Sequence, residues 1–260
     1  MAVVLVGVGA DSEHLRPKLQ LTEEGYFDYI PIPESYPTSE TLTYGTFDLD
    51  HRGGTAANYV TALSPKGGDS DWIDDPAEIE SHPVHHDPNF EAMTFGDRRG
   101  GGGKGSTLID NFGSSEETDV LGFYTGVKEN ETDSNVNRFL YGYMTVEAVH
   151  DLSKLEGEEY HEALQEFPAN AHTKRLAAAG TPKHDDVVIV EGRTPSAKLN
   201  HPVKISERID QAPWYRVTEK FADEYNVEGG QKGIGRKFPL VLDLDGKKFL
   251  EKVKSESITK

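Results

Sequence analysis

Apolar runs and two-residue alternation predict a set of β-strands along the chain. The segment AVVLVGVG at residues 2–9 is apolar throughout and predicts a buried strand. Residues 119–127 and 138–149 combine branched and aromatic side chains on alternating faces, and the polar stretch between them predicts that the two strands are antiparallel neighbours. DDVVIVEG at 185–192 predicts a strand too apolar to lie at a sheet edge. A last strand is expected within residues 238–245.

Helical periodicity is confined to a few short segments. KLEGEEYHEALQEF at 154–167 places its apolar residues on one side and meets Pro168, so it predicts a short amphipathic helix that ends there. TEKFADEYN at 218–226 and the lysine-rich tail after residue 245 predict two more helices.

Between the first strand and residue 118 the pattern is irregular. YFDYIPIP at 26–33 alternates and then meets prolines, which predicts a short edge strand running into extended chain. Residues 34–118 are rich in glycine, proline, aspartate and serine and predict loops with brief elements. A loop region of this length in a compact domain is usually functional or disordered.

Together these elements predict an α+β fold. We expect a small, strongly bent, mostly antiparallel sheet or barrel, with peripheral short helices and long loops. No internal repeat and no clear boundary divides the chain, so residues 1–260 are expected to form a single domain.

Composition restricts the partners. The chain has 45 acidic and 27 basic residues, so its formal net charge is −18, and this charge is spread along the chain. Such diffuse acidity is typical of a solvated surface and resembles that of proteins from salt-loving organisms. An acidic body repels phosphate backbones, so recognition of a nucleic acid would have to come from a local pocket.

Cysteine and membrane signals are both missing from the sequence. Because there is no cysteine, disulfides and thiolate metal sites are excluded, and any metal would be held by His, Asp or Glu. No run approaches the roughly 20 apolar residues of a membrane span, and no basic leader precedes 2–9. The protein is expected to be cytoplasmic, without contact to a membrane.

The segment HPVHHDP at 82–88 has the residue types of a metal site. His82, His85, His86 and Asp87 offer nitrogen and oxygen ligands. The flanking prolines, however, prevent the helical spacing of an H-E-x-x-H motif, and two adjacent histidines point in opposite directions in an extended chain. Three interpretations stay open, namely a metal site, an Asp-Pro turn and a polar recognition loop. We favour the recognition loop and predict no bound cofactor.

A basic, glycine-rich loop follows in FGDRRGGGGKGST at 95–107. It is not a Walker motif, because Lys104 is followed by glycine and the first required glycine is Arg98. A flexible surface loop is one interpretation. Alternatively, Arg98, Arg99 and Lys104 could approach a phosphate together with backbone N–H groups.

The two strands at 119–127 and 138–149 are rich in aromatic residues and glycine. Simple core packing accounts for part of this pattern. Alternation sends Phe123 and Tyr124 to opposite faces, and glycine in a strand marks places where a flat ligand or another backbone comes close. Tyr124 and Tyr143 are therefore candidates for stacking on a base.

FPANAHTKR at 167–175 adds polar candidates directly after a helix stop. Asn170 and His172 could bind the polar edge of a ligand. A lone histidine here is more often structural, and as an acid/base catalyst it would need an orienting carboxylate such as Asp185 or Asp186.

Several of these segments occur in an order that resembles one family. They are VGADS, GYFDYIPIPE, HHDPNFEAMTFGD, TDVLGFYTGV, RFLYGYMTVE, NAHTKR and VVIVEG. The chain resembles, over nearly its full length, the nucleotide modification associated domain 3 family, whose genomic neighbours imply a link to DNA base modification and to defence against foreign DNA. The most specific parts are His86-Asp87-Pro88 with Phe95-Gly96-Asp97. Asn89 stands where a second acidic residue is expected, and the glycine run at 100–103 is longer than usual.

A weaker similarity in pattern covers roughly residues 117–193. The segment resembles PUA-like barrels of the EVE and ASCH groups, in which a flipped base sits in a pocket of aromatic and polar side chains. This resemblance implies a PUA-like core and recognition of a modified base.

We therefore predict a nucleotide-binding or modified-base-binding protein associated with DNA modification or defence. Its partner would be a nucleotide or DNA, together with a protein partner in a defence or modification system. Two alternatives are a divalent-metal-dependent nuclease or base-modifying enzyme, which would use His86, Asp87 and Asp97, and a structural subunit of a defence complex. The predicted nucleotide-binding residues are His86, Asp87, Asp97, Arg98, Arg99, Lys104, Tyr124, Tyr143, Asn170 and His172.

Overall fold

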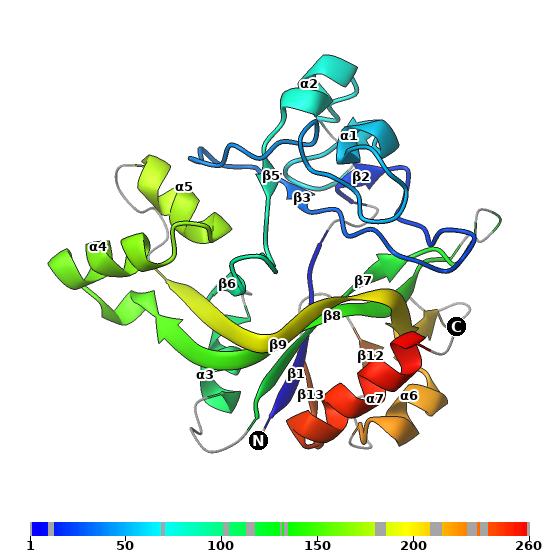
Figure 1. Ribbon diagram of the computed structural model, residues 1–260. Coiled ribbons are helices and arrows are strands. Elements are labelled where there is room, and N and C mark those ends of the chain that lie inside the picture. Colours follow the sequence, from blue (N-terminus) through cyan, green and yellow to red (C-terminus); the bar gives the residue numbers. More distant parts are fainter. Residues whose placement is uncertain are drawn as a thin grey trace.

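The computed structural model shows a curled central sheet, with a long loop region that contains short helices over one face and the C-terminal helices over the other (Figure 1). The glycines at 101–103 and Asp185 lie outside the described residues. The described residues are 2–9, 13–68, 71–100, 104–112, 118–130, 132, 135–179, 186–208, 215–227, 233–234 and 239–258.

Six strands form the central sheet in the order β13-β1-β7-β8-β9-β6. All neighbours are antiparallel except β1 and β7. The α+β class and the strongly bent sheet are thereby confirmed. The strands are β1 (Val3–Gly7), β6 (Thr94–Arg98), β7 (Val120–Val127), β8 (Asn137–Asp151), β9 (Val187–Lys204) and β13 (Leu240–Leu242).

The sheet curls along its two longest strands, β8 and β9, which arch across the centre of Figure 1. Their pairing shifts register between Leu140 and Gly142, between Tyr143 and Thr145, and between Val146 and Ala148. Each bulge adds a residue to one strand and increases the local twist, so a long ribbon bends. The predicted strand at 185–192 is the first part of β9, and it lies between β8 and β6, as its apolar sequence requires.

Side-chain alternation separates two cores. The loop-covered face carries Val4, Val6, Phe123 and Tyr141, and residues from 13–95 pack over it. On the opposite side lies the helix-covered face, which is built from the alternate strand positions and the C-terminal elements. Its buried residues include Val3, Leu5, Tyr124, Tyr143, Leu240, Phe221 and Phe249.

The chain over the loop-covered face contains only brief elements. Within 26–33 just two residues pair as a strand, so the edge strand predicted there is shorter than expected, although Phe27, Tyr29 and Ile30 are buried. Asp75 caps α2 by accepting hydrogen bonds from the amides of Ala77 and Glu78. The elements are β2 (Leu15–Arg16), β3 (Ile32–Pro33), α1 (Ala56–Tyr59), β4 (Ala62–Leu63), α2 (Pro76–Ser81), β5 (Val84–His85) and α3 (Gly105–Asn111).

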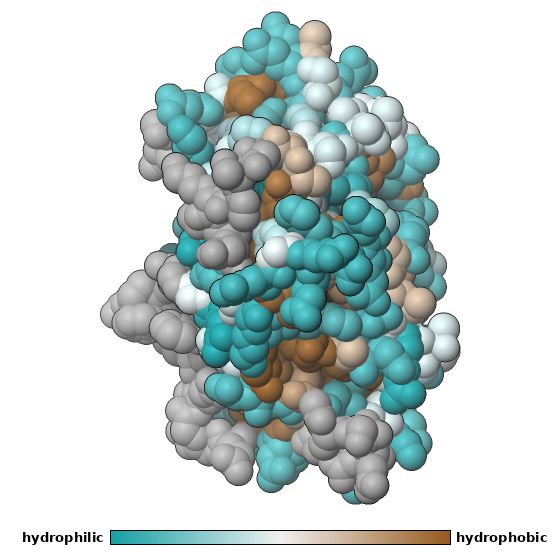
Figure 2. Space-filling view, turned by 90° about the vertical axis from the view of Figure 1, so that its left-hand side faces the viewer, coloured by the Kyte–Doolittle hydropathy of each residue, from teal (hydrophilic) through white to brown (hydrophobic). Residues whose placement is uncertain are grey.

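The helix α4 (Gly157–Glu166) confirms the amphipathic prediction. Tyr160, Ala163 and Phe167 are buried in a small third core. On the face that carries α4 and α5 the surface is mainly hydrophilic, with apolar residues showing between polar ones (Figure 2). The remaining elements are the 3₁₀ turn Leu152–Lys154, α5 (Ala171–Ala179), β10 (Ser206–Arg208), β11 (Tyr215–Val217), α6 (Glu219–Glu224), β12 (Gly233–Ile234) and α7 (Gly246–Ile258). Among the described helices, none combines the length and the hydropathy needed to cross a membrane.

Candidate functional site

The segment 82–88, here called the His-Asp-Pro loop, contains β5 and precedes β6 on the loop-covered face. Its neighbouring histidines point to opposite sides, as the extended backbone requires. His85 meets His172 of α5 edge to face, with ring centroids 4.9 Å apart. His86 meets Phe47, with centroids 5.5 Å apart. The loop therefore has two sides, which face two different sites.

On the His85 side lies a buried polar cluster, defined here as His85, Asp87 and His172. One nitrogen of each histidine and one oxygen of Asp87 lie within 4.8 Å of one another. The Oδ2 atom of Asp87 accepts a hydrogen bond of 2.8 Å from the Gly96 amide and is 3.5 Å from Nε2 of His172. Its Oδ1 atom is buried and has no hydrogen-bond partner among the described residues.

Burial sets the protonation of the polar cluster. Desolvation raises the pKa of the Asp87 carboxyl well above its usual range. It also lowers the pKa of His172 well below that of an ordinary histidine, with His85 and Arg175 adding to the effect. All three groups are thus held toward their neutral forms when nothing is bound between them.

An ion pair supports the polar cluster from behind. Glu34 receives hydrogen bonds of 2.8 Å at both carboxylate oxygens from Nε of Arg175, and its Oε2 atom is 3.1 Å from Nδ1 of His85. Burial alone would raise the pKa of Glu34, but the hydrogen bonds from His85 and Arg175 outweigh this effect and lower the pKa to about 2. Glu34 is therefore a fixed negative charge that orients the His85 ring.

Asn170, Gly96 and an ion pair complete the surroundings. Asn170 accepts a hydrogen bond of 2.9 Å from the His172 amide and thereby fixes the start of α5. A side chain on Gly96 would meet the His172 ring at 2.7 Å, so only glycine lets that ring come this close. Lys104 and Asp97 pair at 2.9 Å, with side chains 15% and 17% exposed, and their charges act on Asp87 and His172.

On the His86 side lies an aromatic pocket of about 310 Å³. Tyr29, Phe47 and His86 are buried and, with the half-buried Phe90, make its floor. Gly142 of β8 makes room for Phe90, because a Cβ atom there would lie 2.5 Å from the Phe90 ring. The rim is formed by Leu42 and by five polar or charged residues, namely Thr46, Asp48, Asp50, Glu91 and Lys198.

Tyr29 joins the aromatic pocket to the polar cluster. Its hydroxyl donates a hydrogen bond of 2.8 Å to the backbone oxygen of Asp87. Its ring stacks on Tyr141 of β8, with centroids 5.1 Å apart and planes 13° from parallel. The tyrosine that approaches this region from the sheet is therefore Tyr141.

Of the ten site residues expected from the sequence, the structure places five at the polar cluster and a sixth at the aromatic pocket. Asp87, Asp97, Lys104, Asn170 and His172 form or surround the polar cluster, and His86 lines the aromatic pocket.

Other predicted residues lie elsewhere. Tyr124 and Tyr143 are buried in the core of the helix-covered face, so the structure contradicts their grouping with the His-Asp-Pro loop. Alternation correctly separated the faces of the strands, but it cannot say which face carries a site. Arg98 pairs with Asp186 at 3.1 Å and Arg99 with Asp151 at 2.9 Å. Their role in phosphate binding stays a prediction.

Sequence reasoning did not select Glu34, Arg175, Tyr29, Phe47 or Phe90. Glu34 and Arg175 are 141 positions apart, and no local pattern links them. Phe47 and Phe90 lie in irregular segments without periodicity, and the alternation within 26–33 does not single out Tyr29 as part of a site. The one available sequence signal for Glu34 and Arg175 is that they end GYFDYIPIPE and NAHTKR, two of the segments that carry the family resemblance.

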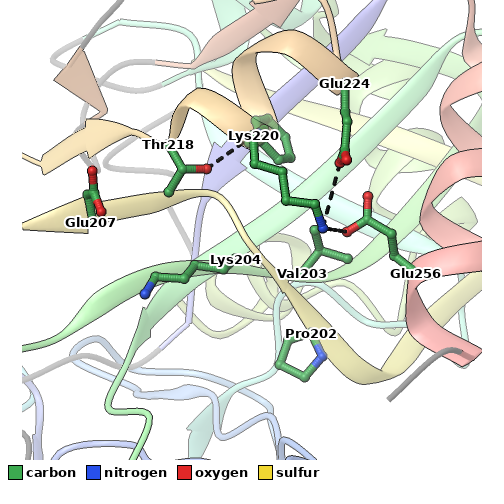
Figure 3. Close-up of a pocket in the computed structure, with 9 residues that line it drawn as sticks. Pro202, Val203, Lys204, Glu207, Thr218, Lys220, Glu224 and Glu256 are labelled. Carbon is green, nitrogen blue, oxygen red and sulfur yellow. Dashed lines mark hydrogen bonds and ion pairs between the residues drawn. The ribbon is translucent and has the colours of Figure 1, made fainter.

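A second cavity, of about 200 Å³, opens on the other side of the molecule between β9, α6 and α7 (Figure 3). Lys220 spans it and points toward Glu224 and Glu256, at 3.9 and 3.7 Å. Its charged groups thus pair largely with each other, and Val203 and Phe221 supply its apolar part.

Comparison with known proteins gives one match. A family model described as nucleotide modification associated domain 3 matches residues 2–232 of the 260. No curated protein and no solved structure matches the chain significantly, and the similarity to PUA-like barrels stays a prediction. The matched range contains the whole polar cluster and the whole aromatic pocket, whereas Glu256 of the second cavity lies beyond it.

Proposed function

Because the chain belongs to the nucleotide modification associated domain 3 family, we propose that it binds a nucleobase or nucleoside, unmodified or modified, in the aromatic pocket. The observation that carries this proposal is the combination of a floor of aromatic rings with a polar rim, inside the range that the family shares. Association with nucleotide modification follows from the family, and the ligand is our inference.

The size of the aromatic pocket supports a small ligand. Its volume of about 310 Å³ is at the lower end of the roughly 300–1,000 Å³ typical of small-molecule sites. One base with its sugar is the part of a nucleic acid that such a space can accommodate. A base in a duplex would have to leave the stack to enter it, at a cost of a few kcal/mol.

The rim favours the base over the phosphate. Asp48, Asp50 and Glu91 bring three carboxylates to the rim, and Lys198 brings one ammonium that is 2.5 Å from Asp50. Carboxylates accept hydrogen bonds and repel phosphate, so this rim matches the amino and imino N–H groups of a base edge. The formal charge of −18 acts in the same direction.

The floor supplies flat apolar contacts. Phe47 and Phe90 are available for contact with a planar ring, and stacking on an aromatic side chain contributes about 1–3 kcal/mol per base. His86 also lines the pocket and adds its ring nitrogens to the floor. Desolvation lowers the pKa of His86, which favours the neutral ring with one hydrogen-bond donor and one acceptor.

The test is a calorimetric titration of the protein with a panel of normal and modified nucleosides and the matching monophosphates. We expect saturable binding of at least one nucleoside and no gain in affinity from the phosphate. Phe90→Leu keeps an apolar side chain but removes the ring, and it should weaken binding about 10-fold or more. The matched control is Phe167→Leu in the third core, which should leave the affinity unchanged. Equal affinities in the two variants, or no binding of any nucleoside, would reject the proposal.

A second candidate function is a divalent-metal-dependent nuclease or base-modifying enzyme. The observation that favours it is the convergence of His85, Asp87 and His172. His86 faces the aromatic pocket, and Asp97 is paired with Lys104, so the ligand set differs from the His86, Asp87 and Asp97 expected from the sequence. Roles in defence against foreign DNA, or as a structural subunit of a defence complex, stay predictions.

A further inference from the structure

Three potential metal ligands come from two distant parts of the chain. His85 ends β5, Asp87 lies in the loop that follows, and His172 is in the first turn of α5. One ligand atom from each lies within 4.8 Å of the other two, and the side chains are only 2–12% exposed. A tetrahedral zinc ion with bonds of about 2.0–2.1 Å separates its ligand atoms by roughly 3.3 Å. The 3.5 Å between Asp87 Oδ2 and His172 Nε2 is close to that spacing.

Asp87 has an unused oxygen that points to a missing ligand. Its Oδ1 atom is buried without a hydrogen-bond partner among the described residues. A buried carboxyl oxygen left without a partner is unfavourable, and in native proteins such atoms are uncommon and usually reflect a function, a water or an ion. The hydrogen bond from the Gly96 amide accounts for Oδ2 of Asp87 but not for Oδ1.

The histidines are held in the way that metal-binding histidines are held. Nδ1 of His85 is 3.1 Å from Glu34, so an N–H on that atom leaves the lone pair on Nε2. A carboxylate behind a histidine orients the ring and makes it a better ligand. His172 is fixed by the hydrogen bond from its amide to Asn170 and by the close approach that Gly96 allows.

The surrounding charges permit a cation. Arg175 and Lys104 are the nearest positive groups, and each is paired, with Glu34 and with Asp97. Counting Glu34, Asp97 and an ionised Asp87 against these two cations, the site carries one net negative charge. A bound divalent ion would therefore change the net charge of the site from −1 to +1.

We propose that His85, Asp87 and His172 bind a divalent transition-metal ion, with Glu34 as the orienting carboxylate behind His85. Two imidazoles and one carboxylate suit zinc, iron(II) or manganese better than magnesium or calcium, which prefer oxygen ligands. Three protein ligands leave at least one coordination position for water or another molecule. This site is distinct from the aromatic pocket and goes beyond the proposed nucleoside binding.

The test uses the full chain after removal of metal by a chelator. Zn²⁺ is titrated by calorimetry in competition with a chelator of known affinity, and Co²⁺ is added separately, because its visible spectrum reports coordination number. We expect one Zn²⁺ per chain, a Co²⁺ spectrum of four- or five-coordination, and a higher melting temperature with Zn²⁺.

Two variants remove ligands with little change in shape. Asp87→Asn keeps an acceptor for the Gly96 amide, and His172→Gln keeps a polar side chain. Each should weaken Zn²⁺ binding at least 100-fold, and Glu34→Gln should weaken it about 10-fold to 100-fold. His161→Ala removes an exposed histidine from α4 and is the control for unspecific binding, with no change expected. Circular dichroism confirms that each variant is folded, and either ligand variant suffices if the other fails to fold.

Either of two results would overturn the proposal. One is a wild-type protein that takes up no Zn²⁺ under these conditions. The other is stoichiometric Zn²⁺ binding that persists in folded Asp87→Asn or His172→Gln protein, which would place the ion elsewhere. In both cases the polar cluster would be a hydrogen-bonded structural element. The proposal of nucleoside binding would be unaffected, because the titration with nucleosides tests it independently.

Discussion

The two faces of the central sheet bury different kinds of residues. The helix-covered face is closed mainly by aliphatic and aromatic side chains, among them Tyr124 and Phe249, and its buried arginine, Arg138, stacks on Tyr215. The loop-covered face buries, beside its apolar core, ionisable groups such as Glu34, Asp87 and His85. Apolar burial stabilises a fold without further condition, whereas each buried ionisable group needs a partner. The loop-covered face is therefore the one whose composition requires an explanation beyond stability.

The cavities on the two sides differ in the same way. In the second cavity, the ammonium of Lys220 lies 3.9 and 3.7 Å from the carboxylates of Glu224 and Glu256, so its ion-pair partners belong to the protein itself. In the polar cluster, Asp87 retains a free oxygen among the described residues, and the adjoining aromatic pocket presents rings and carboxylates to solvent. A site that completes its own interactions is typical of structure, and one that leaves interactions open is typical of binding.

The largest expected effect is on the helix-covered face. Phe249 is fully buried there, next to Tyr225. Phe249→Ala should lower the free energy of unfolding by about 3–5 kcal/mol, as measured by urea denaturation. If the two faces are independent, the folded fraction of this variant binds nucleoside and Zn²⁺ with wild-type affinity. A loss of nucleoside affinity as large as that in Phe90→Leu would show that the two faces are not independent.

A smaller, pH-dependent effect is expected from Glu34 in metal-free protein. Its pKa is lowered to about 2 in the folded chain, so its ionised form stabilises the fold above its ordinary pKa near 4.3. That stabilisation, on the order of 3 kcal/mol, is lost as the pH falls from about 4.5 to about 2. The difference in unfolding free energy between the wild type and Glu34→Gln should thus be largest above about pH 5 and shrink towards pH 2. A constant difference over this range, in urea denaturation at several pH values, would contradict the assignment of Glu34 as a fixed charge.

The smallest expected effect concerns the two arginines at the end of β6, Arg98 and Arg99. Arg98 and Arg99 have side chains 39% and 42% exposed, and their ion pairs are at the surface. Replacing both by alanine should change the unfolding free energy by less than about 1 kcal/mol. If they contact phosphate, as the sequence predicts, the double variant binds single-stranded oligonucleotides more weakly and with a shallower salt dependence, while nucleoside affinity stays the same. Unchanged oligonucleotide binding would reject that role.

The fold was predictable where periodicity is strong. The sequence of β7 and β8 specified two antiparallel strands with Phe123 and Tyr124 on opposite faces, and the structure agrees. It could not specify which face would carry a site, since that depends on what packs there from 13–95 and from the C-terminal helices. The sequence therefore favours Tyr124 and Tyr143 without knowing their face, whereas in the structure Tyr141 is the strand tyrosine that stacks on Tyr29 beside Asp87.

The candidate site was predictable in part, because some of its residues lie in dense polar motifs. Asp87, Asp97, Asn170 and His172 stand out from segments with no apolar pattern, and they do converge. Other members depend on contacts between distant segments. The pairing of Glu34 with Arg175 and the enclosure of the aromatic pocket exist only after the chain has folded across the sheet.

The central claim is that ligand binding belongs to the loop-covered face, and hydrogen exchange with a bound nucleoside tests it most directly. Amide exchange is followed by mass spectrometry with and without a saturating nucleoside identified by calorimetry. We predict slower exchange in residues 42–50 and 86–91, which line the aromatic pocket, and no change in residues 202–208, 218–224 and 246–258. Protection confined to these last three segments, around the second cavity, would contradict the account.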